Sequence, residues 1–73
     1  MDNRVKKQIK KLLLEEDLKI VNLVPMLSEK TGKQYVYDNF IHRLGRATIT
    51  YEEMLDIADI LGYEIKFVKK EIN

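Results

Sequence analysis

Apolar residues recur every three or four positions along most of the chain, which is the spacing of an α-helix with one buried face. The clearest case is Val36, Phe40 and Leu44, flanked by Tyr37 and Ile41. At about 100° per residue these side chains share one face of a helix, and the polar residues between them point the other way. Four stretches of this kind predict helices over residues 4–16, 20–31, 36–45 and 51–61.

The ends of the first and fourth helices carry local signals. Asn3 stands where an N-terminal cap is expected for the first helix. Thr50 and Glu53 have the spacing of a capping box, and Gly62 follows the fourth helix at the position where glycine commonly ends one. We therefore expect the fourth helix to begin directly after Thr50 and to end before Gly62.

The second helix has two possible starting points. A start near Asn22 would place Pro25 in the first turn, where proline is tolerated. A start at Ile20 would place Pro25 inside the helix, where it removes a backbone hydrogen bond. Gly32 is expected to end the helix in either case.

The apolar period changes after the fourth helix from about 3.6 residues to 2. Tyr63, Ile65 and Phe67 alternate with more polar residues and predict one β-strand over residues 63–69. A single strand leaves its backbone donors and acceptors unpaired, so we expect a homodimer in which the strands of two copies pair antiparallel. The alternative is a loose tail that packs Ile65 and Phe67 onto the helices.

Length and composition limit the possible classes of protein. The 73 residues make one domain, 1–73, without cysteine and with a single histidine, which excludes disulfides and the usual zinc sites. No apolar run approaches the ~20 residues of a membrane span, and the short run Leu12–Leu14 stops in acidic residues, unlike a signal peptide. We expect a soluble, cytoplasmic protein that binds no metal or cofactor.

Charge is distributed unevenly although the net charge is only +1. Residues 47–64 carry five acidic groups and no basic one, whereas residues 1–16, 33–46 and 65–73 are each mildly basic. This polarity suits a molecule that presents one side to nucleic acid, and it suits equally well two chains that meet through opposite charges.

No constellation of an enzyme is recognisable in the chain. Glu52 and Glu53 are adjacent on a helix, so their side chains diverge by about 100° and cannot flank one reacting bond. His42 with Asp38 offers two metal ligands where zinc requires three or four. We expect a protein that is not an enzyme and that has no small-molecule substrate.

The order of the motifs resembles the Cro/C1-type (XRE-like) helix-turn-helix family. The resemblance rests on Leu23-Val24, on Asn39-Phe40 with Arg43-Leu44, and on the run from Leu55 to Gly62. It implies a mainly α fold of four to five helices with one C-terminal β-strand, as in small bacterial or phage variants. Members of this family mostly bind double-stranded DNA as dimers, often as repressors, so the resemblance implies a small transcriptional regulator.

Within that resemblance, helix 36–45 is the segment that would enter the major groove. Asn39 could form hydrogen bonds with adenine, and Arg43 or Arg46 could form them with guanine or bind a phosphate. The residues expected to contact DNA are Lys33, Gln34, Tyr37, Asp38, Asn39, His42, Arg43 and Arg46.

The sequence departs from the family pattern at three places. Lys19 and Ile20 stand where a serine or threonine cap and a glutamine are usual, the connection over residues 28–35 is long, and Asp38 is acidic. Ile20, Asp38 and the net charge of only +1 would be explained by an alternative function on the same scaffold, a protein–protein interaction or antitoxin-like regulatory module without DNA binding.

Overall fold

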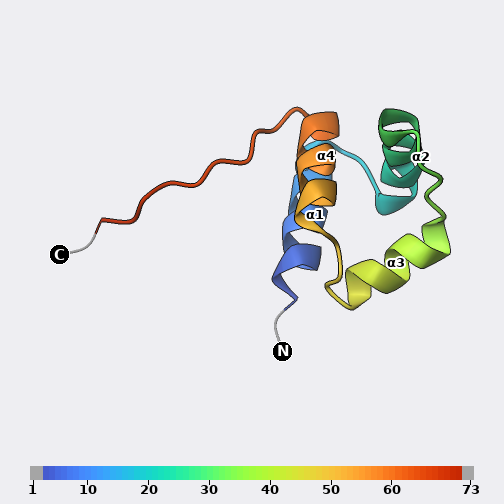
Figure 1. Ribbon diagram of the computed structural model, residues 1–73, viewed down its shortest axis with the longest axis horizontal. Helices are drawn as coiled ribbons and strands as arrows, with labels where there is room; N and C mark the ends of the chain where they lie inside the picture. Colours follow the sequence, from blue (N-terminus) through green and yellow to red (C-terminus); the bar gives the residue numbers. More distant parts are fainter. Residues whose placement is uncertain (1–2, 72–73) are drawn as a thin grey trace.

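The computed structural model describes residues 3–71, and four helices account for most of them (Figure 1). The helices are α1 (Arg4–Glu15), α2 (Ile20–Thr31), α3 (Tyr37–Gly45) and α4 (Tyr51–Leu61). The mainly helical fold predicted from the sequence is confirmed. The predicted ends of α2 and α4 agree with the structure, while α1 ends one residue earlier and α3 begins one residue later than expected.

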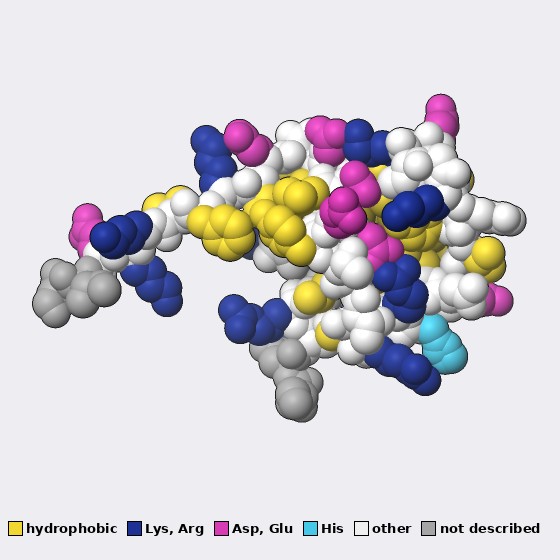
Figure 2. All heavy atoms as spheres, viewed as in Figure 1, with side chains coloured by type: hydrophobic (Ala, Val, Ile, Leu, Met, Phe, Trp, Pro, Cys, Tyr) yellow, Lys and Arg dark blue, Asp and Glu magenta, His cyan; other side chains and the backbone are white. Residues whose placement is uncertain are grey.

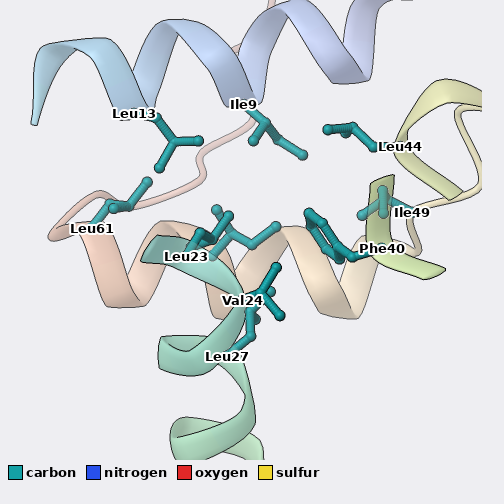
Figure 3. Close-up of a cluster of buried hydrophobic side chains, with 10 residues drawn as sticks. Ile9, Leu13, Leu23, Val24, Leu27, Phe40, Leu44, Ile49 and Leu61 are labelled. Carbon is teal, nitrogen blue, oxygen red and sulfur yellow. The ribbon is translucent and has the colours of Figure 1, made fainter. Parts of the chain in front are cut away.

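Side chains from all four helices meet in one small core (Figure 3). Phe40 and Leu44 of α3 are each 1% exposed, so the apolar face predicted for this helix is its buried face. The buried hydrophobic cluster consists of Ile9, Leu13, Leu23, Val24, Leu27, Phe40, Leu44, Ile49, Ile57 and Leu61.

Asn3 joins the start of α1 to the end of α3. Its Oδ1 accepts a hydrogen bond from the Lys6 N–H at 3.0 Å, which is the cap expected from the sequence. Its amide Nδ2 donates to the carbonyl oxygens of Leu44 at 2.9 Å and Gly45 at 3.2 Å. One side chain therefore satisfies backbone groups at the ends of two helices.

The second helix begins at Ile20, so Asn22 is not its cap. Lys19 holds the N-cap position, and the Asn22 Oδ1 accepts a hydrogen bond from the Lys19 N–H at 3.0 Å. Pro25 lies inside the helix and has no N–H to donate to the carbonyl of Val21. Of the two starting points allowed by the sequence, the structure adopts the one with an internal proline.

The connection between α2 and α3, residues 32–36, is held by polar contacts. Gly32 ends α2 with φ 74°, in the left-handed region that glycine enters without steric cost. The Ser28 hydroxyl oxygen accepts a hydrogen bond from the Tyr35 N–H at 3.0 Å. The long connection anticipated from the sequence is therefore a helical extension followed by a short loop. The loop leads back along α2, so that α3 lies near the end at which α2 begins (Figure 1).

The strand expected over residues 63–69 is not found among residues 3–71. After Gly62 the chain runs away from the helices (Figure 1). A strand needs a partner strand for its backbone hydrogen bonds, and residues 3–71 do not supply one. The Tyr63 hydroxyl donates to the Glu16 carboxylate at 2.9 Å, and Ile65 is half-buried. Phe67 is 87% exposed, although its ring centroid lies 6.2 Å from that of Tyr51.

Among the described residues, no helix combines the length and the apolar character that crossing a membrane requires.

Candidate nucleic-acid interface

One edge of α3 is exposed to solvent. Asp38, Asn39, His42 and Arg46 are all exposed, on the side of the helix that faces away from Phe40. The view in Figure 2 shows Lys and Arg side chains near α3 and a group of Asp and Glu side chains over α4. The helix therefore presents a row of hydrogen-bonding groups to solvent, as a helix that reads the major groove does.

Arg43 points away from this row and toward α4. Its Nη2 forms a salt bridge with Glu53 Oε1 and lies 3.5 Å from the carbonyl oxygen of Thr48. The Arg43 side chain is 37% exposed, compared with 10% for the Glu53 side chain. Arg43, which the sequence placed among the reading residues, thus joins α3 to α4 within the fold.

Glu53 is a buried carboxylate that accepts hydrogen bonds from three segments. The Thr50 N–H donates to it at 2.8 Å, which completes the predicted capping box, and the Tyr35 hydroxyl donates at 3.1 Å. Burial opposes ionisation of Glu53, but the hydrogen bonds from Arg43 and Thr50 outweigh burial and lower its pKa from 4.5 to about 2.

The same cluster affects the phenol of Tyr35. Its burial and the nearby negative charge of Glu53 raise the pKa of the Tyr35 hydroxyl above 10.0, so this group remains a hydrogen-bond donor at neutral pH. Among the described residues, no buried side-chain nitrogen or oxygen lacks a hydrogen-bond partner. The connection before α3, α3 itself and α4 are therefore linked through one carboxylate.

Two grooves flank α3, and they differ in charge. The first, of about 610 Å³, contains Lys33, Gln34 and Arg43 together with the acidic residues of α4. Its lining residues are Thr31, Lys33, Gln34, Tyr35, Arg43, Thr50, Glu52, Glu53 and Asp56. Lys33 and Gln34 thus share a groove with three carboxylates, away from the exposed row of α3.

The second groove, of about 460 Å³, lies at the start of α3. Tyr37 lines it and is 43% exposed. The basic residues Lys10 and Lys19 line it as well, and none of its lining residues is acidic. The remaining lining residues are apolar: Leu13, Leu14, Leu18, Ile20 and Val21.

The eight residues expected to contact DNA therefore fall into three groups. Four form the exposed row of α3, three line the mixed-charge groove, and Tyr37 lines the basic groove. The sequence pattern identifies Glu53 only as the capping partner of Thr50. The spacing along the chain contains no signal for the contacts of Glu53 with Tyr35 and Arg43, because they depend on how α3 and the connection before it pack against α4.

Comparison of the chain with models of protein families, with curated proteins and with solved structures finds no significant match.

Proposed function

We propose that this protein binds double-stranded DNA sequence-specifically as a small repressor-like regulator of transcription, with α3 in the major groove. The observation that carries the proposal is the pairing of a buried and an exposed face on one short helix. Phe40 and Leu44 are each 1% exposed, while Asn39, His42 and Arg46 are exposed on the opposite side. Anchoring of this kind fixes the direction of the polar side chains, which base recognition requires.

The chemistry of the exposed row suits base edges. Asn39 can form two hydrogen bonds with adenine, and Arg46 can do so with guanine or can bind a phosphate. His42 adds a donor or acceptor between them. Asp38 lies in the first turn of α3, where the helix dipole stabilises its negative charge. Its carboxylate can accept a hydrogen bond from the amino group of cytosine.

The proposal is tested by selecting duplexes from a random library and measuring affinity for the selected duplex at several salt concentrations. Arg46→Ala should weaken binding about fivefold or more, and it should reduce the salt dependence if Arg46 contacts a phosphate. Lys70→Ala, which removes a positive charge from the exposed tail, serves as the control. Failure to bind any duplex in dilute salt, with a folded protein, would exclude this function.

We further propose that the functional unit is a homodimer whose copies pair through residues 63–69, as an antiparallel two-stranded sheet. The described monomer leaves this segment extended and without a partner strand, and Phe67 and Val68 are 87% and 83% exposed. A second copy would satisfy the backbone groups of both segments and cover Phe67. Two copies of α3 would then double the DNA contacts.

Sedimentation equilibrium of the full chain tests the dimer. Phe67→Asp should convert a dimer to a monomer without loss of helical circular dichroism, because Phe67 contributes little to the buried core. Lys70→Asp, outside the expected strand, should leave the dimer intact. A wild-type protein that is monomeric at high micromolar concentration would contradict the pairing.

A protein-interaction or antitoxin-like module is the second candidate function. It is favoured by the exposed apolar residues beside the start of α3, since Leu14 is 79% and Val21 56% exposed. If the protein is such a module, it should show no salt-dependent binding to mixed duplex DNA. A salt titration with mixed duplex DNA therefore separates the two candidate functions.

A further inference from the structure

We infer that the C-terminal segments of two copies pair antiparallel in one register, in which Ile65 lies on the two-fold axis and Glu64 of each copy lies opposite Lys66 of the other. The inference rests on the proposed homodimer and adds to it the residues that face each other. It narrows the pairing to residues 63–67 and sets the distance between the two α3 helices.

Side chains along the described part of this segment alternate as they do in a β-strand. The Nζ of Lys66 lies 3.7 Å from the Oε2 of Glu64, so these two side chains lie on the same side of the chain. Both residues are exposed, whereas Ile65 between them is half-buried. Successive residues of a strand point to opposite faces, so the segment already presents a charged face and an apolar one.

The apolar face consists of Tyr63, Ile65 and Phe67, and both of its ends contact the helical domain. The Tyr63 hydroxyl donates to the Glu16 carboxylate at 2.9 Å. The ring centroid of Phe67 lies 6.2 Å from that of Tyr51, the first residue of α4. Phe67 nevertheless remains 87% exposed, so one chain alone covers this face incompletely.

A stable pairing keeps the apolar faces of the two copies together. In an antiparallel pair, residues that lie directly opposite each other point to the same face. A register that sets odd positions opposite even ones would therefore place Ile65 of one copy on the same face as Glu64 and Lys66 of the other. Odd positions must lie opposite odd ones, and in every such register one residue lies opposite itself on the two-fold axis.

An even-numbered residue on the axis would bring like charges together. With Glu64 or Lys66 on the axis, two carboxylates or two ammonium groups would lie directly opposite each other, which is destabilising. With Val68 on the axis, Lys66 would lie opposite Lys70. Charge repulsion therefore disfavours all three of these registers.

Two of the odd-numbered residues, Tyr63 and Phe67, are also unsuitable on the axis. With Tyr63 there, Ile65 would lie opposite Leu61, which belongs to α4 and cannot take part in a strand. With Phe67 there, Ile65 would lie opposite Lys69, so the apolar face would contain a charge. Ile65 is the residue that remains.

The register with Ile65 on the axis avoids all of these conflicts. Glu64 of each copy then lies opposite Lys66 of the other, which gives the dimer two cross-strand ion pairs. Tyr63 lies opposite Phe67, and aromatic residues in such positions attract each other. The second copy thereby covers Phe67, which one chain leaves exposed.

Each paired segment follows α4 directly, so the register sets the distance between the two domains. Gly62 ends α4, and the first paired residue is Tyr63. Sliding one strand past the other by two residues would move the domains by about 7 Å, which is about two base-pair steps of a duplex. The register thereby selects the separation of half-sites that two copies of α3 can reach.

Disulfide cross-linking of single-cysteine variants tests which residue lies on the axis. The chain contains no cysteine, so each variant carries one thiol. The Cα of a residue on the axis lies about 5 Å from its copy, within the range of a disulfide, whereas the Cα of the next residue lies about 8 Å from its copy and outside that range. Each variant is oxidised mildly at a concentration at which sedimentation equilibrium finds a dimer. Ile65→Cys should form a covalent dimer about tenfold faster than Glu64→Cys or Lys66→Cys.

Charge reversal tests the cross-strand ion pairs. Glu64→Lys would set like charges opposite each other at two places in the dimer, so the dissociation constant should rise about tenfold. Adding Lys66→Glu to the same chain restores both pairs, and the dissociation constant should return toward the wild-type value. With Glu64, Lys66 or Phe67 on the axis, residues 64 and 66 do not face each other, so the second change would not compensate for the first. Lys70→Glu lies outside the paired residues and serves as the control.

The register and the dimer fail in different ways. Equal cross-linking rates for the three cysteine variants, or a faster reaction of Glu64→Cys or Lys66→Cys, would overturn the register while the protein remains a dimer. A double charge reversal that leaves the dissociation constant as high as Glu64→Lys alone would do the same. A wild-type protein that is monomeric at high micromolar concentration would instead overturn the proposed homodimer itself.

Discussion

The replacement Glu53→Gln should destabilise the protein strongly, although it changes only one atom of the side chain. Glu53 is 7% exposed and accepts hydrogen bonds from Tyr35, Thr50 and Arg43. The fall of its pKa from 4.5 to about 2 means that folding favours the ionised carboxyl over the neutral one by about 3 kcal/mol, since one pKa unit corresponds to ~1.4 kcal/mol. A neutral amide loses this contribution and faces Arg43 without a counter-charge.

Urea unfolding followed by circular dichroism at pH 7 measures the effect. We expect the free energy of unfolding to fall by about 3 kcal/mol, which for a chain of this size lowers the melting temperature by roughly 12 °C or more. The control is Glu52→Gln at the neighbouring exposed position, where the change should be below about 1 kcal/mol. A Glu53→Gln protein within about 0.5 kcal/mol of the wild type would refute the role assigned to this carboxylate.

The pH dependence has a definite sign. The folded pKa of Glu53 lies below its unfolded value of 4.5, so its contribution is fully present above pH 4.5 and is lost as the pH falls toward about 2. The difference in stability between the wild type and Glu53→Gln should therefore be constant from pH 7 down to about pH 5 and shrink below it. A difference that persists unchanged at pH 2.5 would show that ionisation of Glu53 is not its origin.

Two further predictions concern helix ends. Gly62→Ala should destabilise the protein by about 1 kcal/mol, because Gly62 has φ 83° and alanine is strained there. Gly45→Ala should stabilise the protein by up to about 1 kcal/mol, because Gly45 lies in α3 and no atom lies within 4 Å of an added Cβ. Thermal melts in which the two variants shift the melting temperature in the same direction would contradict this prediction. Asn3→Ala should cost about 1–2 kcal/mol because it removes both the acceptor for the Lys6 N–H and the donor to the Leu44 carbonyl. Asn3→Ser, which keeps a capping oxygen and loses the amide donor, should cost less, and equal losses in urea unfolding would argue against the cap as a separate contribution.

The helices were predictable because each is specified locally. Apolar spacing marked all four, and the capping box at Thr50 with the glycine at position 62 fixed both ends of α4. Pro25 was ambiguous because the sequence does not say whether burial of α2 compensates for a missing hydrogen bond. In the structure Leu23, Val24 and Leu27 are buried on either side of Pro25, and this packing retains the helix.

The remaining differences arise from contacts between distant segments. The pattern of residues 63–69 is typical of a strand, but a strand forms only against a partner, and residues 3–71 contain no second one. The contact between Arg43 and Glu53 spans ten positions and depends on the angle at which α3 meets α4. The spacing of apolar residues predicts which face of each helix is buried, but it does not predict the angle at which two helices pack.

The position of Arg43 on α3 explains why its side chain contacts α4 and does not join the exposed row of α3. At about 100° per residue, Arg43 lies between the direction of Asn39 and that of the buried Phe40, so its side chain leaves the helix at the boundary of the core. There it meets Glu53, and the pair joins two helices. Arg46 lies inside the exposed sector and makes no such contact within residues 3–71.

This difference decides how DNA-binding variants are interpreted. Arg43→Ala removes the counter-charge of a buried carboxylate, which is expected to destabilise the fold by several kcal/mol. Weaker DNA binding by that variant would then follow from a displaced α3 even if Arg43 never touched a base. Arg46→Ala leaves the core and the Glu53 cluster intact, so a loss of affinity at unchanged stability reports the contact itself. A matched pair of stability and binding measurements on Arg43→Ala and Arg46→Ala therefore separates the positioning of α3 from recognition by it.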